Sequence, residues 1–256
     1  MAKENTNQRT GDKVVIGGDY QYNAFYSGSA LQRCWHRFKL ITAISDLGIK
    51  DGMRLLDVGC GSGMLAALVA KENPTVDITG IDGNMAAVAF CREQWKALSN
   101  CAFAQGRIDE LGAFAGGSID GIAFLEVIEH ITEQQAMQVM EGFYRILRAG
   151  GVLVVSTPNR KSVWPLLEWI MDFFRLAPRL KGDQHEKLYS GDELSAMARS
   201  AGFTVWKKRR INFIAPWVAV VSEKYARRVH DWEIRQGWIP GSILLYTLIK
   251  PRTGGG

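Results

Sequence analysis

Closely spaced cysteines, proline-rich segments and long apolar runs are all missing from this sequence. Of its 256 residues 4 are cysteine and 7 are proline, and no CxxC or short Cys/His spacing occurs. The absence of closely spaced cysteines argues against a zinc site and against a disulfide framework, and it fits a reducing compartment. No apolar run reaches the roughly 18 residues of a membrane span, and the polar residues 1–10 lack the apolar core of a signal peptide. We therefore expect a soluble, unsecreted, cytoplasmic protein.

The composition is that of an ordinary globular domain with one uneven feature, its charge. Apolar residues make up 47% of the chain and charged residues 22%, so a packed core is expected. Residues 206–256 hold ten basic and three acidic side chains, whereas the net charge of the whole chain is +5. Such a basic part is typical of contact with nucleic acid, an anionic membrane or an acidic partner, and equally of a solvated face.

Short apolar runs alternate with helix-like stretches along most of the chain. The expected strands are Arg54–Val58, Asp77–Ile81, Ala102–Gln105, Gly121–Leu125, Val152–Ser156, Phe203–Ile211 and Ile243–Ile249. The expected helices are Ala30–Leu47, Met64–Lys71, Met85–Leu98, Glu133–Leu147, Val163–Leu176, Gly191–Ser200 and Val218–Arg235. The alternation predicts an α/β fold, a doubly wound, seven-stranded, mostly parallel sheet whose last two strands form an antiparallel pair at one edge.

The domain organisation follows from the same pattern. We expect residues 1–29 to be a mobile N-terminal segment and residues 30–256 to form a single domain. The segments at about 160–190 and 213–240 interrupt the alternation of strands and helices. Together with the helix over Ala30–Leu47, they are expected to form a helical cap on the sheet.

A glycine-rich turn carries the sharpest chemical signal. In Leu55-Leu56-Asp57-Val58-Gly59-Cys60-Gly61-Ser62-Gly63-Met64 the chain leaves a strand and enters a helix, where glycines let the backbone approach a ligand. The third glycine of a nicotinamide-binding GxGxxG is replaced by Met64, and no GK[ST] phosphate loop follows. Asp82 ends the next expected strand, 21 residues after Gly61, where a carboxylate can accept hydrogen bonds from ribose hydroxyls.

With these features the chain resembles the class I S-adenosylmethionine-dependent methyltransferases, strongly over 53–156 and loosely over 188–250. The resemblance implies a Rossmann-like methyltransferase fold, an enzyme and S-adenosyl-L-methionine as its cofactor. It implies that the methionine and ribose parts face Asp57, Gly59, Cys60, Gly61 and Gly63, and that Asp82 and Gly83 hold the ribose. It also implies that the adenine lies beside Met85, Arg107 and Ile108, and the methionine end beside Leu125 and Glu126.

The segment Glu126-Val127-Ile128-Glu129-His130 is similar to a run in the O-methyltransferases of ubiquinone biosynthesis. On a helix, Glu126, Glu129 and His130 would share one face at the carboxyl edge of the sheet. A histidine, with an ordinary pKa of about 6.5, suits removal of a hydroxyl proton near neutrality. His130 and Glu129 are therefore candidate catalytic residues, with His185 closing over the substrate. The same cluster, Glu126, Glu129 and His130, is a candidate site for Mg²⁺.

The acceptor is expected to be a small lipophilic or aromatic molecule, methylated at a hydroxyl oxygen. Trp164, Trp169, Phe173 and Phe174 are too many large apolar residues for one core face, and residues 213–238 mix tryptophans with basic side chains. This mixture indicates a hydrophobic substrate lid, a peripheral membrane contact or a packed helical cap.

Alternative interpretations are methylation of nitrogen or carbon in a small molecule, and an RNA or protein methyltransferase that uses the basic C-terminal part. A nucleic-acid substrate is disfavoured, because Leu125-Glu126-Val127-Ile128 stands where base-methylating relatives carry an Asn/Asp-Pro-Pro-Tyr type of run. A cofactor-binding module without catalytic activity is a further alternative.

Overall fold

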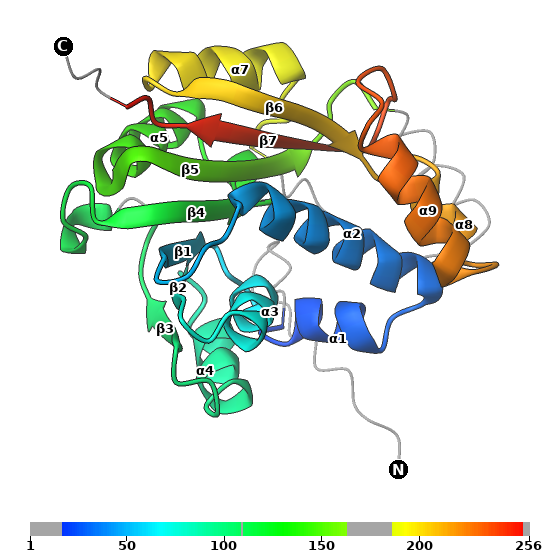
Figure 1. Cartoon of the computed structure of the whole chain (residues 1–256), viewed down its shortest axis with the longest axis horizontal. Helices are drawn as coiled ribbons and strands as arrows, with labels where there is room; N and C mark the ends of the chain where they lie inside the picture. Colours follow the sequence, from blue (N-terminus) through cyan, green and yellow to red (C-terminus); the bar gives the residue numbers. More distant parts are fainter. Residues whose placement is uncertain (1–16, 109, 163–185, 253–256) are drawn as a thin grey trace.

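The computed structural model describes residues 17–108, 110–162 and 186–252. Its centre is a seven-stranded sheet in the order β3-β2-β1-β4-β5-β7-β6 (Figure 1). The strands are β1 Arg54–Val58, β2 Asp77–Asp82, β3 Cys101–Gln105, β4 Ile119–Leu125, β5 Leu147–Pro158, β6 Thr204–Ile211 and β7 Ile243–Ile249. β1 to β5 pair in parallel, whereas β7 is antiparallel to both β5 and β6. The mostly parallel sheet with an antiparallel edge pair is confirmed.

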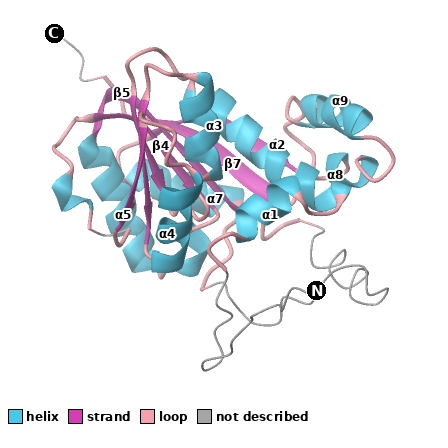
Figure 2. Ribbon diagram, turned by 90° about the horizontal axis from the view of Figure 1, so that it is seen from below, coloured by secondary structure: helices cyan, strands magenta, loops and turns pink. Residues whose placement is uncertain are grey.

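Two apolar cores, one on each face of the sheet, hold the helices in place. On one face α2 Ala30–Leu47, α3 Met64–Glu72 and α4 Met85–Gln94 pack through residues such as Leu47 and Leu65. On the other face α5 Glu133–Ile146 and α7 Gly191–Ser200 pack through residues such as Phe143 and Leu194. Figure 2 shows helices on both sides of the strands. Because both faces are covered, β4 and β7 read as nearly continuous apolar runs.

The strand order creates one site where a ligand can enter from the edge of the sheet. β1 lies between β2 and β4, so the chain crosses from one side of β1 to the other after β3. At such a reversal the loops that follow the neighbouring strands diverge, one toward each face. The loops after β1, β2 and β4 therefore meet at the carboxyl edge beside β1, and these loops carry most of the candidate residues.

The N-terminal region differs from the sequence-based expectation. Residues 17–29 were expected to be mobile, but they contain a short helix, α1 Tyr20–Tyr26. Its Tyr22 ring packs against Phe90 and Trp95 of the α4 region, with ring centroids 5.5 Å and 5.8 Å away. The seven residues of α1 show too little apolar periodicity to predict a helix from sequence, because so short a helix depends on tertiary contacts. Residues 1–16 lie outside the described part of the chain.

The C-terminal cap also differs from expectation, because the helix predicted over 218–235 begins only at Glu223 and a separate short helix precedes it. α8 spans Ala215–Val218 and α9 spans Glu223–Glu233, and a turn over residues 219–222 separates them. The Ser222 hydroxyl caps α9 by accepting from the Tyr225 N–H, and the Glu233 carboxylate accepts from the backbone N–H groups of Ile214 and Ala215. These contacts fix where each helix begins, which apolar spacing does not predict.

The remaining part of the expected cap lies mostly outside the described residues. The helix predicted over 163–176 falls there, and so does His185. Among the helices that the structure describes, none combines the length and apolarity needed to cross a bilayer.

Candidate active site

The turn between β1 and α3 is built so that its backbone faces the site. Gly59, Gly61 and Gly63 all have positive φ, at 75°, 52° and 71°, a region that residues with a Cβ rarely adopt. A Cβ on Gly59 would lie 2.3 Å from Val127, and one on Gly63 would lie 2.6 Å from Phe103. The turn is closed by the Gly59 N–H, which donates to the Ile81 carbonyl at 2.7 Å. Both backbone shape and space therefore require glycine here.

Asp57 lies directly before this turn, at the floor of the site. Its side chain is 4% exposed and lines the cavity beside β1. Burial, and secondly the negative charge of Asp82, raise the pKa of Asp57 to about 7, while the Ala66 backbone N–H acts in the opposite direction. Asp57 therefore exchanges a proton near neutral pH and is poised to respond to a cation placed beside it.

Asp82, at the end of β2, is oriented by the backbone around it. One carboxylate oxygen accepts from the Gly61 N–H and the other from the Asn84 N–H, each at 2.8 Å. Carboxylate oxygens accept more than one hydrogen bond, so both retain capacity for a further donor. The structure thus ties Asp82 to the glycine turn, as the spacing in the sequence indicated.

The residues expected around the adenine lie on the outer rim. Met85, the first residue of α4, is 67% exposed. The Arg107 side chain is also exposed, with its Nε 3.9 Å from a Glu110 carboxylate oxygen. Ile108 is partly buried against the apolar core. A Cβ on Gly83 would meet no described atom within 4 Å, so space does not require glycine there.

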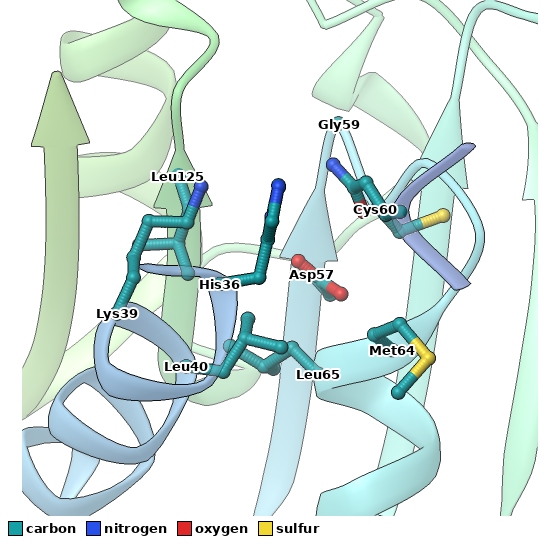
Figure 3. A pocket seen from close by; sticks show the side chains of 10 residues that line it. His36, Lys39, Leu40, Asp57, Gly59, Cys60, Met64, Leu65 and Leu125 are labelled. Atoms are coloured by element: carbon teal, nitrogen blue, oxygen red, sulfur yellow. The ribbon is translucent and has the colours of Figure 1, made fainter. Parts of the chain in front are cut away.

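Helix α2 brings a histidine and a lysine into the cavity, and the sequence had not singled them out. His36 and Lys39 line it together with Asp57, Gly59 and Leu125 (Figure 3). Figure 3 shows both side-chain nitrogens directed into the space between Leu125 and Gly59. The apolar periodicity of α2 predicted only a packing helix. The signal that could have revealed a polar face was the spacing of three residues between His36 and Lys39, which places both on one side of the helix.

The charge states of these two residues follow from their surroundings. Burial, and secondly the Lys39 charge, lower the pKa of His36 to about 3, so His36 is neutral at physiological pH. Lys39 is only 6% exposed, and its positive charge also acts on the buried Glu129, whose pKa it lowers. A buried ammonium that lines a cavity can pair with an anionic group of a ligand that enters it.

The loop after β4 holds the candidate catalytic residues, in a geometry that differs from expectation. Glu126 has a φ of 55°, so it starts a loop and not a helix, and only Ile128–His130 form a short 3-10 turn. The Glu126 carboxylate accepts from the Ser156 hydroxyl at 2.7 Å. Glu129 is 1% exposed, and one of its oxygens lies 3.9 Å from His130 Nε2, whose side chain is 39% exposed. Glu129 and His130 are therefore neighbours, one buried and the other partly exposed, and neither lines the cavity beside β1.

Burial dominates the protonation of Glu129. Its pKa is raised well above the ordinary value, first by burial and then by the charge of Glu126, while Thr157 and Lys39 act in the opposite direction. Cys60 behaves similarly, since its contact with Cys91 and its burial raise the pKa of its thiol. Cys60 therefore remains a neutral thiol, and its contribution to the site is its backbone position in the turn.

The expectation of a Mg²⁺ site is not supported. Across the described ranges, no three His, Cys, Asp or Glu side chains come close enough to hold a metal ion. Glu126, Glu129 and His130 do not share one helical face, because Glu126 is in a loop and only Ile128–His130 form a short 3-10 turn. The helical spacing assumed from the sequence was wrong at this point.

Comparisons with known proteins agree with this geometry. Residues 49–208 match the methyltransferase domain family. A ubiquinone biosynthesis O-methyltransferase from Psychrobacter arcticus is 32% identical over 158 residues, which cover 60% of this chain and 60% of the relative. One from Pseudomonas fluorescens is 33% identical over 160 residues, covering 60% of this chain and 66% of the relative. The matches thus span less than two thirds of the length of these relatives.

Solved structures share the fold. An S-adenosylmethionine-dependent methyltransferase from Archaeoglobus fulgidus aligns with a TM-score of 0.61 at 18% identity, over 90% of this chain and 99% of that one. Magnesium protoporphyrin IX methyltransferase from Synechocystis, solved with bound S-adenosylhomocysteine, aligns with a TM-score of 0.62 at 14% identity, over 91% and 94%. At these identities the likeness concerns the fold alone. The family match covers more than half of the chain, which therefore belongs to the methyltransferase domain family.

Proposed function

We propose that the protein transfers a methyl group from S-adenosylmethionine to a hydroxyl oxygen of a small lipophilic or aromatic acceptor. The observation that carries the proposal is the convergence, at one edge of the sheet, of the glycine turn, Asp82 and the buried Lys39. The similarity to ubiquinone biosynthesis O-methyltransferases supports an oxygen acceptor. The apolar wall of the cavity, with Leu40, Leu65 and Leu125, supports a lipophilic one.

The residues present fit the cofactor at each of its ends. Positive-φ glycines leave no side chain between the turn and a ligand, and Asp82 has free acceptor capacity for ribose hydroxyls. The buried Lys39 ammonium suits the carboxylate of the methionine part, and the Asp57 carboxylate suits its ammonium. When bound, the cofactor supplies a methyl group already activated on a sulfonium. The rim residues Met85, Arg107 and Ile108 remain the proposed adenine side, and Gly83, next to Asp82, the proposed ribose side.

The protein's main tasks are then alignment and removal of the hydroxyl proton. We assign the base to His130, which is accessible, and a positioning role to Glu129, which lies behind it at 3.9 Å. Because its pKa is raised, Glu129 can hold a proton at neutral pH, which avoids a second negative charge beside Glu126. His185, outside the described residues, remains proposed to close over the acceptor.

The test combines calorimetry with turnover. The full chain should bind S-adenosylhomocysteine, and Asp82→Ala should weaken that binding about tenfold or more, which is about 1.4 kcal/mol. His130→Ala should bind the same ligand normally but lose at least about 100-fold in kcat with phenolic and catechol-like acceptors. Glu129→Gln should lower kcat less and shift the pH profile.

Each outcome separates one part of the proposal from the others. Normal turnover by His130→Ala removes the assigned base but leaves the methyl-transfer proposal intact. Turnover with amines or carbon acceptors and none with hydroxyl compounds would show that the acceptor atom is misassigned. Absence of S-adenosylhomocysteine binding would overturn the assigned cofactor site.

A further inference from the structure

The turn between α8 and α9 exposes large apolar side chains at its tip. Val220 and Val221 are 67% and 89% exposed, although valine is a residue that proteins usually bury. Both belong to the turn over residues 219–222, which forms the apex of the pair of helices. Figures 1 and 2 place α8 and α9 at one end of the molecule, beyond the end of the sheet. These adjacent valines belong to none of the apolar cores formed by the described residues.

Helix α9 continues the exposed surface with aromatic and basic side chains. Tyr225, Arg228 and Trp232 are spaced three and four residues apart, so they lie along one side of the helix. Tyr225 is 58% and Trp232 47% exposed, and the Arg228 guanidinium lies 5.8 Å from the centre of the Tyr225 ring. The opposite side of α9 is buried through Ala226 and His230. The exposed side is therefore a fixed face and not a consequence of a loosely attached helix.

The charge of this face is positive. Lys224, Arg227, Arg228 and Arg235 are exposed on α9 and just after it. Of the nearby acids, Glu223 is already paired with Arg33 and Arg37 of α2, Asp231 is paired with Arg227, and Glu233 is buried. The outward-facing basic side chains thus exceed the acidic charge left to neutralise them.

We propose that this face, defined as Val220, Val221, Lys224, Tyr225, Arg228 and Trp232, docks the protein on an anionic lipid bilayer. Projecting aliphatic side chains can enter the acyl boundary, Trp and Tyr prefer the headgroup level, and lysine and arginine attract anionic headgroups. A protein interface of standard size needs about 800 Å² on each partner, whereas this surface narrows to a two-residue apex. The chemistry therefore favours a lipid surface over a second protein.

The position of the docking face is suited to an acceptor dissolved in lipid. α8 and α9 pack on the outer side of α2 through Cys34, Phe38 and Ala215. The inner side of the same helix carries His36 and Lys39 into the cavity. The helix that contacts the docking elements is thus one wall of the proposed active site, so docking holds that site near the bilayer surface.

Co-sedimentation with vesicles tests the proposal without reference to catalysis. The full chain is mixed with vesicles of phosphatidylcholine containing about 30% phosphatidylglycerol, and with vesicles of phosphatidylcholine alone. We expect binding to the anionic vesicles that weakens as salt rises. Lys224→Glu/Arg228→Glu should lower the partition coefficient at least about 25-fold, because the loss of each basic side chain costs about fivefold and the two new carboxylates are repelled in addition. Val220→Asp/Val221→Asp should also reduce binding.

Trp206→Asp/Lys208→Glu provides the matched control. Trp206 is 56% exposed on the edge strand β6, and Lys208 is exposed on the same strand. This pair removes one exposed aromatic ring and reverses one charge outside the docking face, and it should bind as the parent does. Far-UV circular dichroism and S-adenosylhomocysteine binding show whether each variant is folded.

The proposal is overturned if the parent does not pellet with anionic vesicles at low salt. It is also overturned if the valine and charge variants bind as the parent does, or if the control pair loses as much binding as they do. If the protein self-associates in a way that Val220→Asp/Val221→Asp abolishes while vesicle binding is absent, the face is a protein interface instead. None of these outcomes depends on methyl transfer, so failure here leaves the proposed function untouched.

Discussion

Lys39 offers the most specific test of how the cavity holds its cofactor. It lies on α2, is 6% exposed and is directed into the space between Leu125 and Gly59. The substitution Lys39→Met removes the ammonium and keeps most of the side-chain volume. If the methionine carboxylate pairs with Lys39, this change leaves that carboxylate without its partner near the acidic Asp57.

The expected magnitude follows from the burial of the lysine. A hydrogen bond between charged groups contributes about 1.5–3 kcal/mol, which corresponds to roughly a 10- to 150-fold change in the dissociation constant. We expect a loss in this range for S-adenosylhomocysteine. The free enzyme should remain folded, because Lys39→Met replaces a buried ammonium with an apolar side chain of similar length.

The assay is calorimetric titration with two ligands. S-adenosylhomocysteine carries the amino-acid part, whereas 5′-methylthioadenosine has the nucleoside and the thioether but no carboxylate. Lys39→Met should weaken the first ligand and leave the second unchanged, and Lys39→Arg should preserve both. Lys71→Met, on the exposed end of α3, serves as the matched control. Equal loss for both ligands, or none for either, would refute the pairing of Lys39 with the carboxylate.

Two further predictions concern the fold around the site. His230 is 1% exposed, stacks on Phe38 at 4.4 Å and has its pKa lowered to about 4, mainly by burial. Between about pH 6.5 and 4, His230 is protonated in the unfolded chain but neutral in the folded chain. The free energy of unfolding therefore falls as the pH drops from about 6.5 toward 4. His230→Phe should reduce the loss between about pH 7.5 and 4.5 by about 2–3 kcal/mol in urea unfolding, and an unchanged pH slope would contradict this assignment. Gly59→Ala should destabilise the fold by about 1–3 kcal/mol and abolish ligand binding, because φ is 75° and the new Cβ meets Val127. Gly83→Ala, whose Cβ meets no described atom within 4 Å, should be tolerated in the same thermal unfolding and titration experiments.

The pH experiment on His230 depends on a tautomer that the hydrogen bonds define. The Thr42 hydroxyl donates its single proton to the Phe38 carbonyl at 2.7 Å, so it accepts from His230 Nε2 at 2.9 Å. His230 Nδ1 is then an acceptor without a partner in the described structure. Protonation there would place a charge in an apolar contact, which is the physical reason for the lowered pKa.

Local chemistry made much of the cofactor side predictable from the sequence. Strands β1 and β7 have the expected bounds, since buried strands leave short apolar runs of distinct length. The turn at Gly59 to Gly63 was also evident, because a strand, a tight turn and a helix N-terminus leave a compact glycine pattern. Asp82 followed from its place at the end of the next strand. These features are encoded within a few residues of one another.

Features that depend on distant contacts were missed or predicted wrongly. α1 lacks enough periodicity of its own and is held by Trp95, and the start of α8 is fixed by the distant Glu233. The metal hypothesis was wrong because Glu126 was assumed to be helical, whereas its φ of 55° starts a loop. This backbone conformation is accompanied by a hydrogen bond from the Ser156 hydroxyl of the neighbouring strand β5 to the Glu126 carboxylate, and local propensity does not predict it.

Period and spacing are properties of neighbouring residues, so the chain alone specifies the sheet, the glycine turn and the carboxylates that end β1 and β2. The contribution of α2, which lines the cavity with His36 and Lys39, arises only when the helices pack on the sheet. The burial of Glu129 behind His130 arises in the same way. Burial and the proximity of charges depend on which segments meet across the sheet, and these quantities set the protonation and the ligand preference of the site.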